Sequence, residues 1–287
     1  MKAIDKLEFR KLDLAGLHIL VDWALNEGWN PGPYDAEVYY NTDPDGFYGF
    51  FLEGTLIAGG SIVSYHREFG FMGFFIVRPA YRDLGIGRGL WYQRRDKLIS
   101  RLNKGATIGM DGVLTMQPFY KKGGFEIAYK DIRYKKNGVA FKVDKNIASI
   151  KDDDFDKIMA YDKKCFGFER PQFMKQWLQL PNNRTFKYVE NNILKGFVIV
   201  RKATIGYKIC PLFADNEMIA EALYKASLNS VIGMPLYLDI PTINQGALHI
   251  VNKYKAAYVF ECARMYYGKV PKMEVDKVYG VTTFELG

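Results

Sequence analysis

Three glycines alternate in residues 77–91, which read VRPAYRDLGIGRGLW. Gly85, Gly87 and Gly89 follow an apolar run and precede a stretch with the apolar spacing of a helix. Glycine has no Cβ, so a backbone of this kind can approach a ligand closely. The N–H groups from Leu84 to Gly89 and the positive end of the following helix would form a concavity for an anion. The segment therefore predicts binding of a phosphate group.

Spacing excludes two common phosphate-binding loops. A P-loop needs lysine and a hydroxyl residue directly after a glycine, whereas Arg88 and Gly89 follow Gly87 here. A dinucleotide loop has its third glycine one position later and begins directly at the end of a strand, whereas seven residues separate Val77 from Gly85. What remains is Arg-x-x-Gly-x-Gly, beginning at Arg82, between a strand and a helix.

A second motif, FYKKGGFE at residues 119–126, places Tyr120 before two lysines and a Gly-Gly-Phe sequence. A loop of Arg82, Gly85 and Gly87 followed at this distance by such a tyrosine resembles the GNAT acyltransferase family. Members of that family bind acetyl-coenzyme A. The resemblance therefore implies that the phosphate group is the diphosphate of coenzyme A.

The resemblance covers residues 4–140 and implies a reaction. An amine attacks the thioester directly, without a covalent enzyme intermediate, and Tyr120 is the general acid for the coenzyme A sulfur. The expected acceptor is a primary amine of a small molecule or of lysine, and the expected cosubstrate is acetyl-coenzyme A. The predicted cofactor-binding residues are Phe75, Val77, Arg82, Leu84, Gly85, Gly87, Arg88 and Gly89.

The general base is left open by the sequence. Strand 69–77, where family members often carry a glutamate, has none. We favour Asp111 and Asp35 as catalytic carboxylates and expect Glu27 on the substrate side. Each of them could equally be a helix cap or a surface charge, and a water relay would need no dedicated base. The isolated histidines His18, His66 and His249 favour structural roles, and no cluster has metal-ligand spacing, so we expect no metal.

Alternating and helical patterns predict an α/β (α+β) fold in two halves with a repeated order of elements. The resemblance implies that these halves are two GNAT-like domains, 1–142 and 143–287. Each is expected to be a mixed, mostly antiparallel sheet flanked by helices. The first half predicts strands at 7–12, 46–66 with a turn at Glu53-Gly54, and 69–77, and helices at 14–26, capped by Asp13, and 88–102. The second half repeats the order with strands at 187–202, 204–213, 235–241 and 257–268 and helices at 216–230 and ending near Asn252.

The second half lacks both motifs. YDKKCFGFER, LDIPTIN, ARMY and the final FELG resemble the divergent C-terminal halves of tandem GNAT proteins. In place of the glycine loop it has FADNEMIAEAL, whose Asp215 and Glu217 would repel a diphosphate, and Lys253 stands at the tyrosine position. We expect this half not to bind coenzyme A but to shape the acceptor pocket. Its polar candidates are Asp239, Asn244 and Arg264, which could instead only cap helices and fix turns.

Composition narrows the class of protein. The chain has 287 residues, 48% hydrophobic, and no apolar stretch of membrane-spanning length, so we expect no membrane partner. The net charge of +8 is not clustered, which gives no support for a nucleic-acid partner. Three scattered cysteines predict reduced thiols in a cytoplasmic protein. As to oligomeric state, we expect a monomer or a homodimer. The alternative functions are a non-catalytic acyl-coenzyme A sensor and, third, a nucleic-acid module.

Overall fold

The structure is a computed structural model that describes residues 6–287. The helices and strands of the first half are β1 (Leu7–Lys11), α1 (Leu14–Asn26), α2 (Asp35–Thr42), β2 (Phe47–Leu52), β3 (Thr55–Tyr65), β4 (Phe69–Val77), α3 (Ile86–Arg101), β5 (Thr107–Val113), α4 (Gln117–Lys122) and β6 (Glu126–Asn137). Those of the second half are β7 (Ile147–Ser149), α5 (Phe155–Phe166), α6 (Pro171–Leu178), β8 (Arg184–Glu190), β9 (Ile193–Lys202), β10 (Tyr207–Ala214), α7 (Glu217–Asn229), β11 (Pro235–Pro241), α8 (Gln245–Lys253), β12 (Ala257–Tyr267) and β13 (Val278–Gly280).

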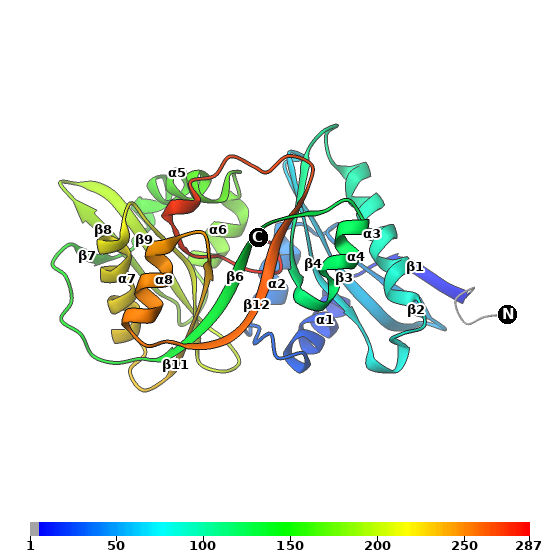
Figure 1. The fold of residues 1–287 in the computed structure, drawn as a ribbon, viewed down its shortest axis with the longest axis horizontal. Coiled ribbons are helices and arrows are strands. Elements are labelled where there is room, and N and C mark those ends of the chain that lie inside the picture. Colours follow the sequence, from blue (N-terminus) through cyan, green and yellow to red (C-terminus); the bar gives the residue numbers. More distant parts are fainter. Residues whose placement is uncertain (1–5) are drawn as a thin grey trace.

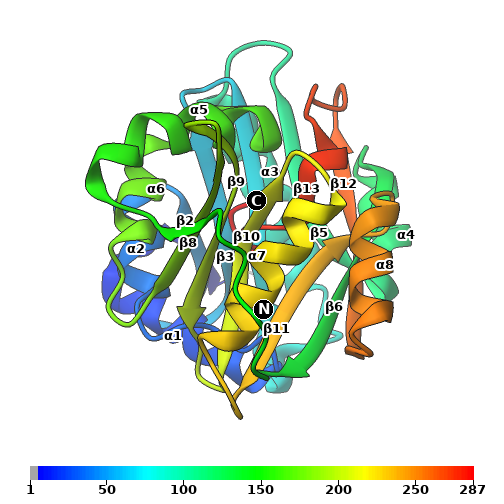
Figure 2. The same cartoon turned by 90° about the vertical axis from the view of Figure 1, so that its left-hand side faces the viewer.

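One mixed, mostly antiparallel sheet runs through the described chain and confirms the predicted fold class. Its strand order is β1-β2-β3-β4-β5-β12-β6-β11-β10-β9-β8-β7, with β13 paired to β10 outside this path. Figure 1 shows the two halves side by side, with the long strands β6 and β12 between them. Figure 2, turned by 90°, shows β6, β11 and β10 from the side of the second half.

β6 of the first half and β12 of the second half each pair with a strand of the other half. β12 pairs with β5, placing Arg264 opposite Asp111, and β6 pairs with β11, placing Arg133 opposite Asp239. β12 and β6 also pair with each other. The predicted division after residue 142 therefore separates the halves in sequence but not in the sheet.

Local signals in the sequence explain several element boundaries. Asp13 caps α1, its carboxylate accepting a hydrogen bond from the N–H of Gly16 at 2.8 Å. The Glu53-Gly54 turn joins β2 to β3, and both residues have positive φ, as a tight hairpin requires. The predicted caps and turns are confirmed at these positions. The sequence did not predict α2, which begins at Asp35 directly after a loop rich in Gly and Pro.

The core continues from one half into the other. Tyr39 of α2 stacks on Trp177 of α6 with ring centroids 6.0 Å apart, and Tyr65 of β3 meets Phe166 of α5 edge to face at 5.2 Å. On the other face of β4 and β5, Trp91 of α3 belongs to a separate buried cluster. None of the helices within residues 6–287 is long and apolar enough to cross a membrane. All three cysteines are buried and unpaired, as predicted.

After β12 the chain passes back across the second half. β13 pairs antiparallel with β10, and the N–H of Val281 then donates to the carbonyl oxygen of Asp239 in β11 at 2.8 Å. Residues 281–287 are almost entirely buried. They end between the two halves, where Figure 1 marks the C-terminus.

Candidate active site between diverging strands

β4 and β5 pair in parallel over only part of their length. Their register runs from Phe69 opposite Thr107 to Met72 opposite Met110. β4 then continues to Val77 and β5 to Val113, so the strands diverge. A cavity of about 640 Å³ opens at this divergence and reaches the glycine loop, α4 and the second half.

A bulge in β4 shapes the wall of this cavity. The register between β3 and β4 shifts between Gly59 and Ser61, and Phe74 has a φ of 50°. A bulge leaves its extra residue unpaired in the ladder, and at Gly73 the backbone N–H and carbonyl oxygen bond to the side chains of Ser61 and Arg94 instead. A left-handed φ costs a non-glycine residue about 1–2 kcal/mol, so the surrounding contacts must hold this conformation.

Arg94 of α3 supplies such a contact. It is fully buried and donates from Nη2 to the carbonyl oxygens of Ser61 and Gly73, the latter at 2.7 Å. A Cβ on Gly60 would lie 2.2 Å from the guanidinium carbon, so glycine there makes room for the arginine. Burial lowers the pKa of Arg94 to about 9.

The glycine loop presents a bare helix end to the cavity. Gly85 has a φ of 79° and precedes α3 without a side-chain cap, so the first N–H groups of the helix have no partner from this position. Gly85, Gly87 and Arg88 line the cavity. Gly89 does not, and its N–H donates to the carbonyl oxygen of Gly85 at 3.2 Å. The N–H groups that are available to an anion therefore end at Arg88. The sequence predicted Gly89 as the last of them, but the N–H of Gly89 is already bonded within the helix.

The two arginines of the loop differ. Arg82 donates from Nε to the carbonyl oxygen of Val77 at 2.9 Å and forms an ion pair with Glu27, so its charge is largely used within the protein. Arg88 is exposed at the cavity and has no ion-pair partner among residues 6–287. Leu84 is 52% exposed and does not line the cavity. Arg88 is therefore the loop cation best placed for an anionic ligand.

Tyr120 lies on α4 at the wall of the cavity and is buried. Its ring stacks with that of Trp91 at 6.0 Å. Burial raises the pKa of Tyr120, and the nearby charge of Arg94 opposes that shift. The phenol is therefore protonated at neutral pH, which is the form that a proton donor needs.

Asp111 lies at the opposite wall, in a buried ion pair. Arg264 binds both of its oxygens, from Nε to Oδ1 at 2.7 Å and from Nη2 to Oδ2 at 2.9 Å. Burial raises the pKa of Asp111. Asp131 of β6 is fully buried beside it, and burial together with Asp111 raises the pKa of Asp131 well above its usual value. Burial therefore disfavours the charged form of both carboxyl groups.

The same cluster has donors that bear on a metal. Asp111, Asp131 and Cys262 place ligand atoms within 4.8 Å of one another. The guanidinium of Arg264 already occupies the oxygens of Asp111, and a cation there would repel it. The donor set therefore fits the arginine better than a metal ion.

Besides Arg264, three other predicted site residues do not line the cavity. Asp35 contacts Arg201 at 2.9 Å and accepts from the N–H of Gly32 at 2.9 Å. Asp239 is bound on both oxygens by Arg133, and Asn244 caps α8. The expectation that Asp35 is a catalytic carboxylate therefore loses its support, because its charge serves the packing of the loop before α2. For Asn244 the structure shows the alternative role, a helix cap.

Several cavity residues were not predicted, and two charged ones among them are Arg133 and Glu285. Arg133 of β6 and Glu285 near the C-terminus both line the cavity, beside the aromatic rings of Trp29, Phe260 and Phe284. Glu285 is only 7% exposed. Glu285 belongs to the FELG sequence at residues 284–287, but no pattern in the neighbouring residues indicates that this sequence lies beside β4.

The equivalent opening in the second half is filled. β10 and β11 pair in parallel from Tyr207–Leu236 to Ile209–Leu238 and then accommodate β13, which pairs with Leu212 and Phe213. At the helix that follows, Asn216 caps α7 with its own side chain. Asp215, which precedes it, contacts Lys277 at 3.3 Å. A coenzyme A arm in this half would have to displace β13.

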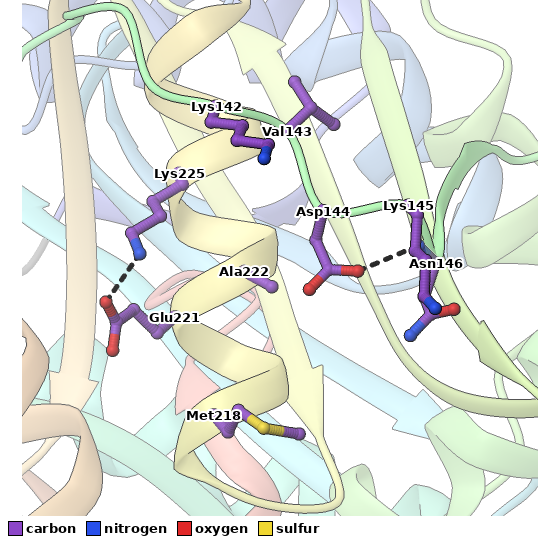
Figure 3. A pocket seen from close by; sticks show the side chains of 9 residues that line it. All are labelled: Lys142, Val143, Asp144, Lys145, Asn146, Met218, Glu221, Ala222 and Lys225. Carbon is purple, nitrogen blue, oxygen red and sulfur yellow. Dashed lines mark hydrogen bonds and ion pairs between the residues drawn. The ribbon is translucent and has the colours of Figure 1, made fainter.

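A separate hollow lies along α7. Figure 3 shows Met218, Glu221 and Lys225 on the helix facing the connecting segment 142–146. Glu221 and Lys225 form an ion pair at 2.8 Å, one helical turn apart. Three lysines and two acidic residues line the hollow, and neither a tyrosine nor a glycine loop is among its lining residues, so it offers no chemistry comparable to the first cavity.

Comparison with known proteins decides the family. The model of the acetyltransferase (GNAT) family matches residues 14–125, and that of an acetyltransferase (GNAT) domain matches residues 158–280. The chain is a tandem GNAT protein. As such it is an acyltransferase. The diverging strands β4 and β5 and the uncapped start of α3 lie in the half that matches the acetyltransferase (GNAT) family model.

Relatives are similar over nearly the whole of this GNAT chain. A holothin acyltransferase from Pseudoalteromonas sp. (strain SANK 73390) is 29% identical over 271 residues, 94% of this chain and 90% of its own. A solved structure from Pyrococcus horikoshii, provisionally described as an acetyltransferase, has a TM-score of 0.83 at 24% identity and covers 98% of this chain and 96% of its own. A tandem GNAT protein of the clavulanic acid biosynthesis pathway has a TM-score of 0.65 at 13% identity, covering 92% and 99%.

Proposed function

We propose that the protein transfers an acetyl or short acyl group from acetyl-coenzyme A to a primary amine, by direct attack and without a covalent enzyme intermediate. The observation that carries this proposal is the cavity that joins the Gly85–Arg88 helix end to Tyr120 along the open edge of β4. A diphosphate would bind at the helix end, and the pantetheine arm would pair with β4 near Phe75 and Val77.

The proposed reaction needs four contributions from these residues. The β4 backbone orients the thioester, and an N–H group that the bulge leaves outside the ladder would stabilise the negative charge that develops on its oxygen. The amine attacks the carbonyl carbon as the C–S bond breaks, and Tyr120 protonates the leaving thiolate. The acceptor enters from the side of Trp29, Phe260 and Phe284. The relative named as a holothin acyltransferase supports acyl transfer as the reaction class.

The acceptor is an amine of a small molecule or of lysine, and the cavity favours the former. Its volume of about 640 Å³ has to hold both the pantetheine arm and the acceptor, and residues of the second half and the C-terminal segment form part of its wall. We propose that the second half shapes this acceptor pocket and does not itself bind coenzyme A, because β13 fills its groove.

A transfer screen tests the proposal. The full chain is incubated with acetyl-coenzyme A and a panel of small amines and lysine peptides, while free thiol and acetylated product are measured. We expect thiol release that matches product formation for at least one amine. Tight binding of acetyl-coenzyme A without transfer to any amine would instead support a non-catalytic sensor.

A further inference from the structure

The C-terminal segment, defined here as residues 275–287, connects the two strand openings of the molecule. Its β13 fills the opening between β10 and β11, with Gly280 opposite Leu212. A Cβ on Gly280 would lie 2.7 Å from the side chain of Leu238 in β11, so the fit between the two strands is close. The segment is thus anchored in the second half before it reaches the first.

From there the segment enters the cavity of the first half. The hydroxyl of Ser61 donates to the carbonyl oxygen of Glu285 at 3.1 Å and accepts from the N–H of Gly73 at 2.9 Å. The hydroxyl of Tyr65 donates to the carbonyl oxygen of Leu286 at 2.9 Å. A Cβ on Gly73 would lie 2.1 Å from the carbonyl oxygen of Glu285. The segment therefore takes the space that a side chain of β4 would need.

This contact gives a physical reason for the missing glutamate in strand 69–77. At Gly73 the strand has no room for a side chain, and the segment brings a carboxylate, that of Glu285, to the cavity beside the same residue. The hydroxyl of Tyr39 lies 3.5 Å from Oε2 of Glu285. A carboxylate thus reaches the cavity from a distant part of the chain.

The charges around Glu285 leave it without a close cation. Each arginine nearby is paired elsewhere: Arg264 with Asp111, Arg133 with Asp239, and Arg201 with Asp35. Lys208 of β10 donates to the carbonyl oxygen of Trp29 at 3.0 Å. Among residues 6–287, no ion pair within 4.0 Å includes Glu285. A buried carboxylate at a cavity is stabilised by a cationic ligand.

We propose that Glu285 binds the ammonium group of the acceptor and accepts its proton. This inference rests on the acyl transfer proposed above. The ammonium gives its first proton to Glu285, which passes it to water, and the neutral amine then forms the C–N bond. As the C–S bond breaks, the sulfur takes a proton from Tyr120, and the second proton lost by the nitrogen restores the phenol. Each catalytic cycle thus releases one proton to solvent.

The test compares Glu285→Gln with the full-length wild type, using the best amine from the screen. We expect kcat/KM for the amine to fall at least about 10²-fold at neutral pH, with the dissociation constant of acetyl-coenzyme A unchanged. The loss should shrink as the pH approaches the pKa of the free amine, because solvent then supplies the neutral form. Glu274→Gln, in a partly exposed ion pair with Lys277, is the matched control.

The pH profile separates a proton acceptor from a packing residue. Tyr39, Asp111, Arg133, Arg201 and Lys208 surround the site, and the negative charge of Glu285 raises the pKa of each of them. Glu285→Gln therefore also changes their titration, whereas Glu285→Asp keeps the charge and serves as the control for that effect. A pH-independent loss would overturn the inference, as would wild-type activity in Glu285→Gln. If Glu285→Gln does not fold, Glu285→Asp replaces it, because aspartate keeps the carboxylate. Glu285→Asp should retain the wild-type pH profile at a lower rate, and a different pH profile would overturn the inference. Absence of transfer by the wild type would contradict the proposed function itself.

Discussion

The carbonyl oxygen of Glu285 occupies the position that a side chain on Gly73 would take, only 2.1 Å from where its Cβ would lie. These residues are far apart in the sequence, yet Ser61 bridges them, accepting from the N–H of Gly73 and donating to Glu285. The active-site wall of the first half is thus completed by a segment that is anchored in the second. Residues of both halves therefore line one cavity.

Replacing Gly73 by alanine should displace this segment. The new methyl group would meet backbone, which cannot move aside as a side chain can, so we expect a loss of about 1–3 kcal/mol in unfolding free energy. Turnover of the amine should fall while acetyl-coenzyme A still binds. Gly70→Ala in the same strand is the control, because its Cβ would meet only the ends of Leu98 and Leu102, and it should be milder. Equal effects of the two changes on turnover would argue against a special role for the contact at Gly73.

Replacing Tyr120 by phenylalanine should slow turnover without weakening cofactor binding. The variant keeps the ring that stacks on Trp91 and loses only the proton donor. We expect kcat to fall about 10²-fold or more, measured by thiol release, with the dissociation constant from calorimetry unchanged. Tyr92→Phe, on α3 outside the cavity lining, should behave as the wild type. If both variants turn over normally, the sulfur receives its proton from another source.

The glycines of the loop should differ in their tolerance of a side chain. Gly85 has a φ of 79°, and alanine there costs about 1–2 kcal/mol, enough to weaken acetyl-coenzyme A binding roughly tenfold if the loop changes shape. Gly89 lies within α3, where a Cβ would contact Phe50 at an ordinary 3.5 Å. Gly89→Ala should therefore keep affinity and raise stability. Equal losses of affinity, measured by calorimetry, would show that both residues contact the cofactor.

The Asp111–Arg264 pair should be important for stability. Arg264→Met leaves two buried carboxylates, Asp111 and Asp131, without their cation, and we expect a loss of about 3–5 kcal/mol in denaturant unfolding. Lys163 forms an exposed pair with Glu169 at 2.7 Å, so Lys163→Ala should unfold close to the wild type. A small effect at Arg264 would mean that both carboxyl groups are already neutral in the folded protein.

Lys208 should make stability depend on pH in the alkaline range. Burial, together with Arg133 and Arg201, lowers its pKa from the usual 10.5 to about 8. Between these values the unfolded chain binds a proton that the folded chain does not, so the unfolding free energy rises with pH by up to about 1.4 kcal/mol per unit. The difference in unfolding free energy between wild type and Lys208→Met should therefore grow in favour of the wild type from pH 8 to 10. A constant difference would show that Lys208 keeps its usual pKa.

Short-range signals predicted much of this molecule. The caps, the hairpin turns and the loop of Arg82, Gly85 and Gly87 depend on neighbouring residues, and the structure places them as expected. The repeat of the strand and helix order also predicted two related halves. These features share one property: each is specified within a few residues of where it acts.

Long-range pairing could not be predicted in the same way. The positions of β6 and β12 depend on which partner strand each meets, and alternation along a strand says nothing about that choice. For the same reason Asp111 and Arg264 were each predicted as site residues, but not as partners of one another. Glu285 was missed because its role depends on where the C-terminal segment ends, and Asp35 was overvalued because Arg201, which neutralises it, is distant in the sequence.

A crystal structure of the full chain with coenzyme A would test the central claim most directly. The account predicts one molecule per chain, with its diphosphate at the N–H groups before Gly89, its arm beside β4, and its sulfur within about 3.5 Å of the Tyr120 hydroxyl. β13 should remain between β10 and β11. Coenzyme A bound in the second half with β13 displaced, or a sulfur remote from Tyr120, would contradict the account.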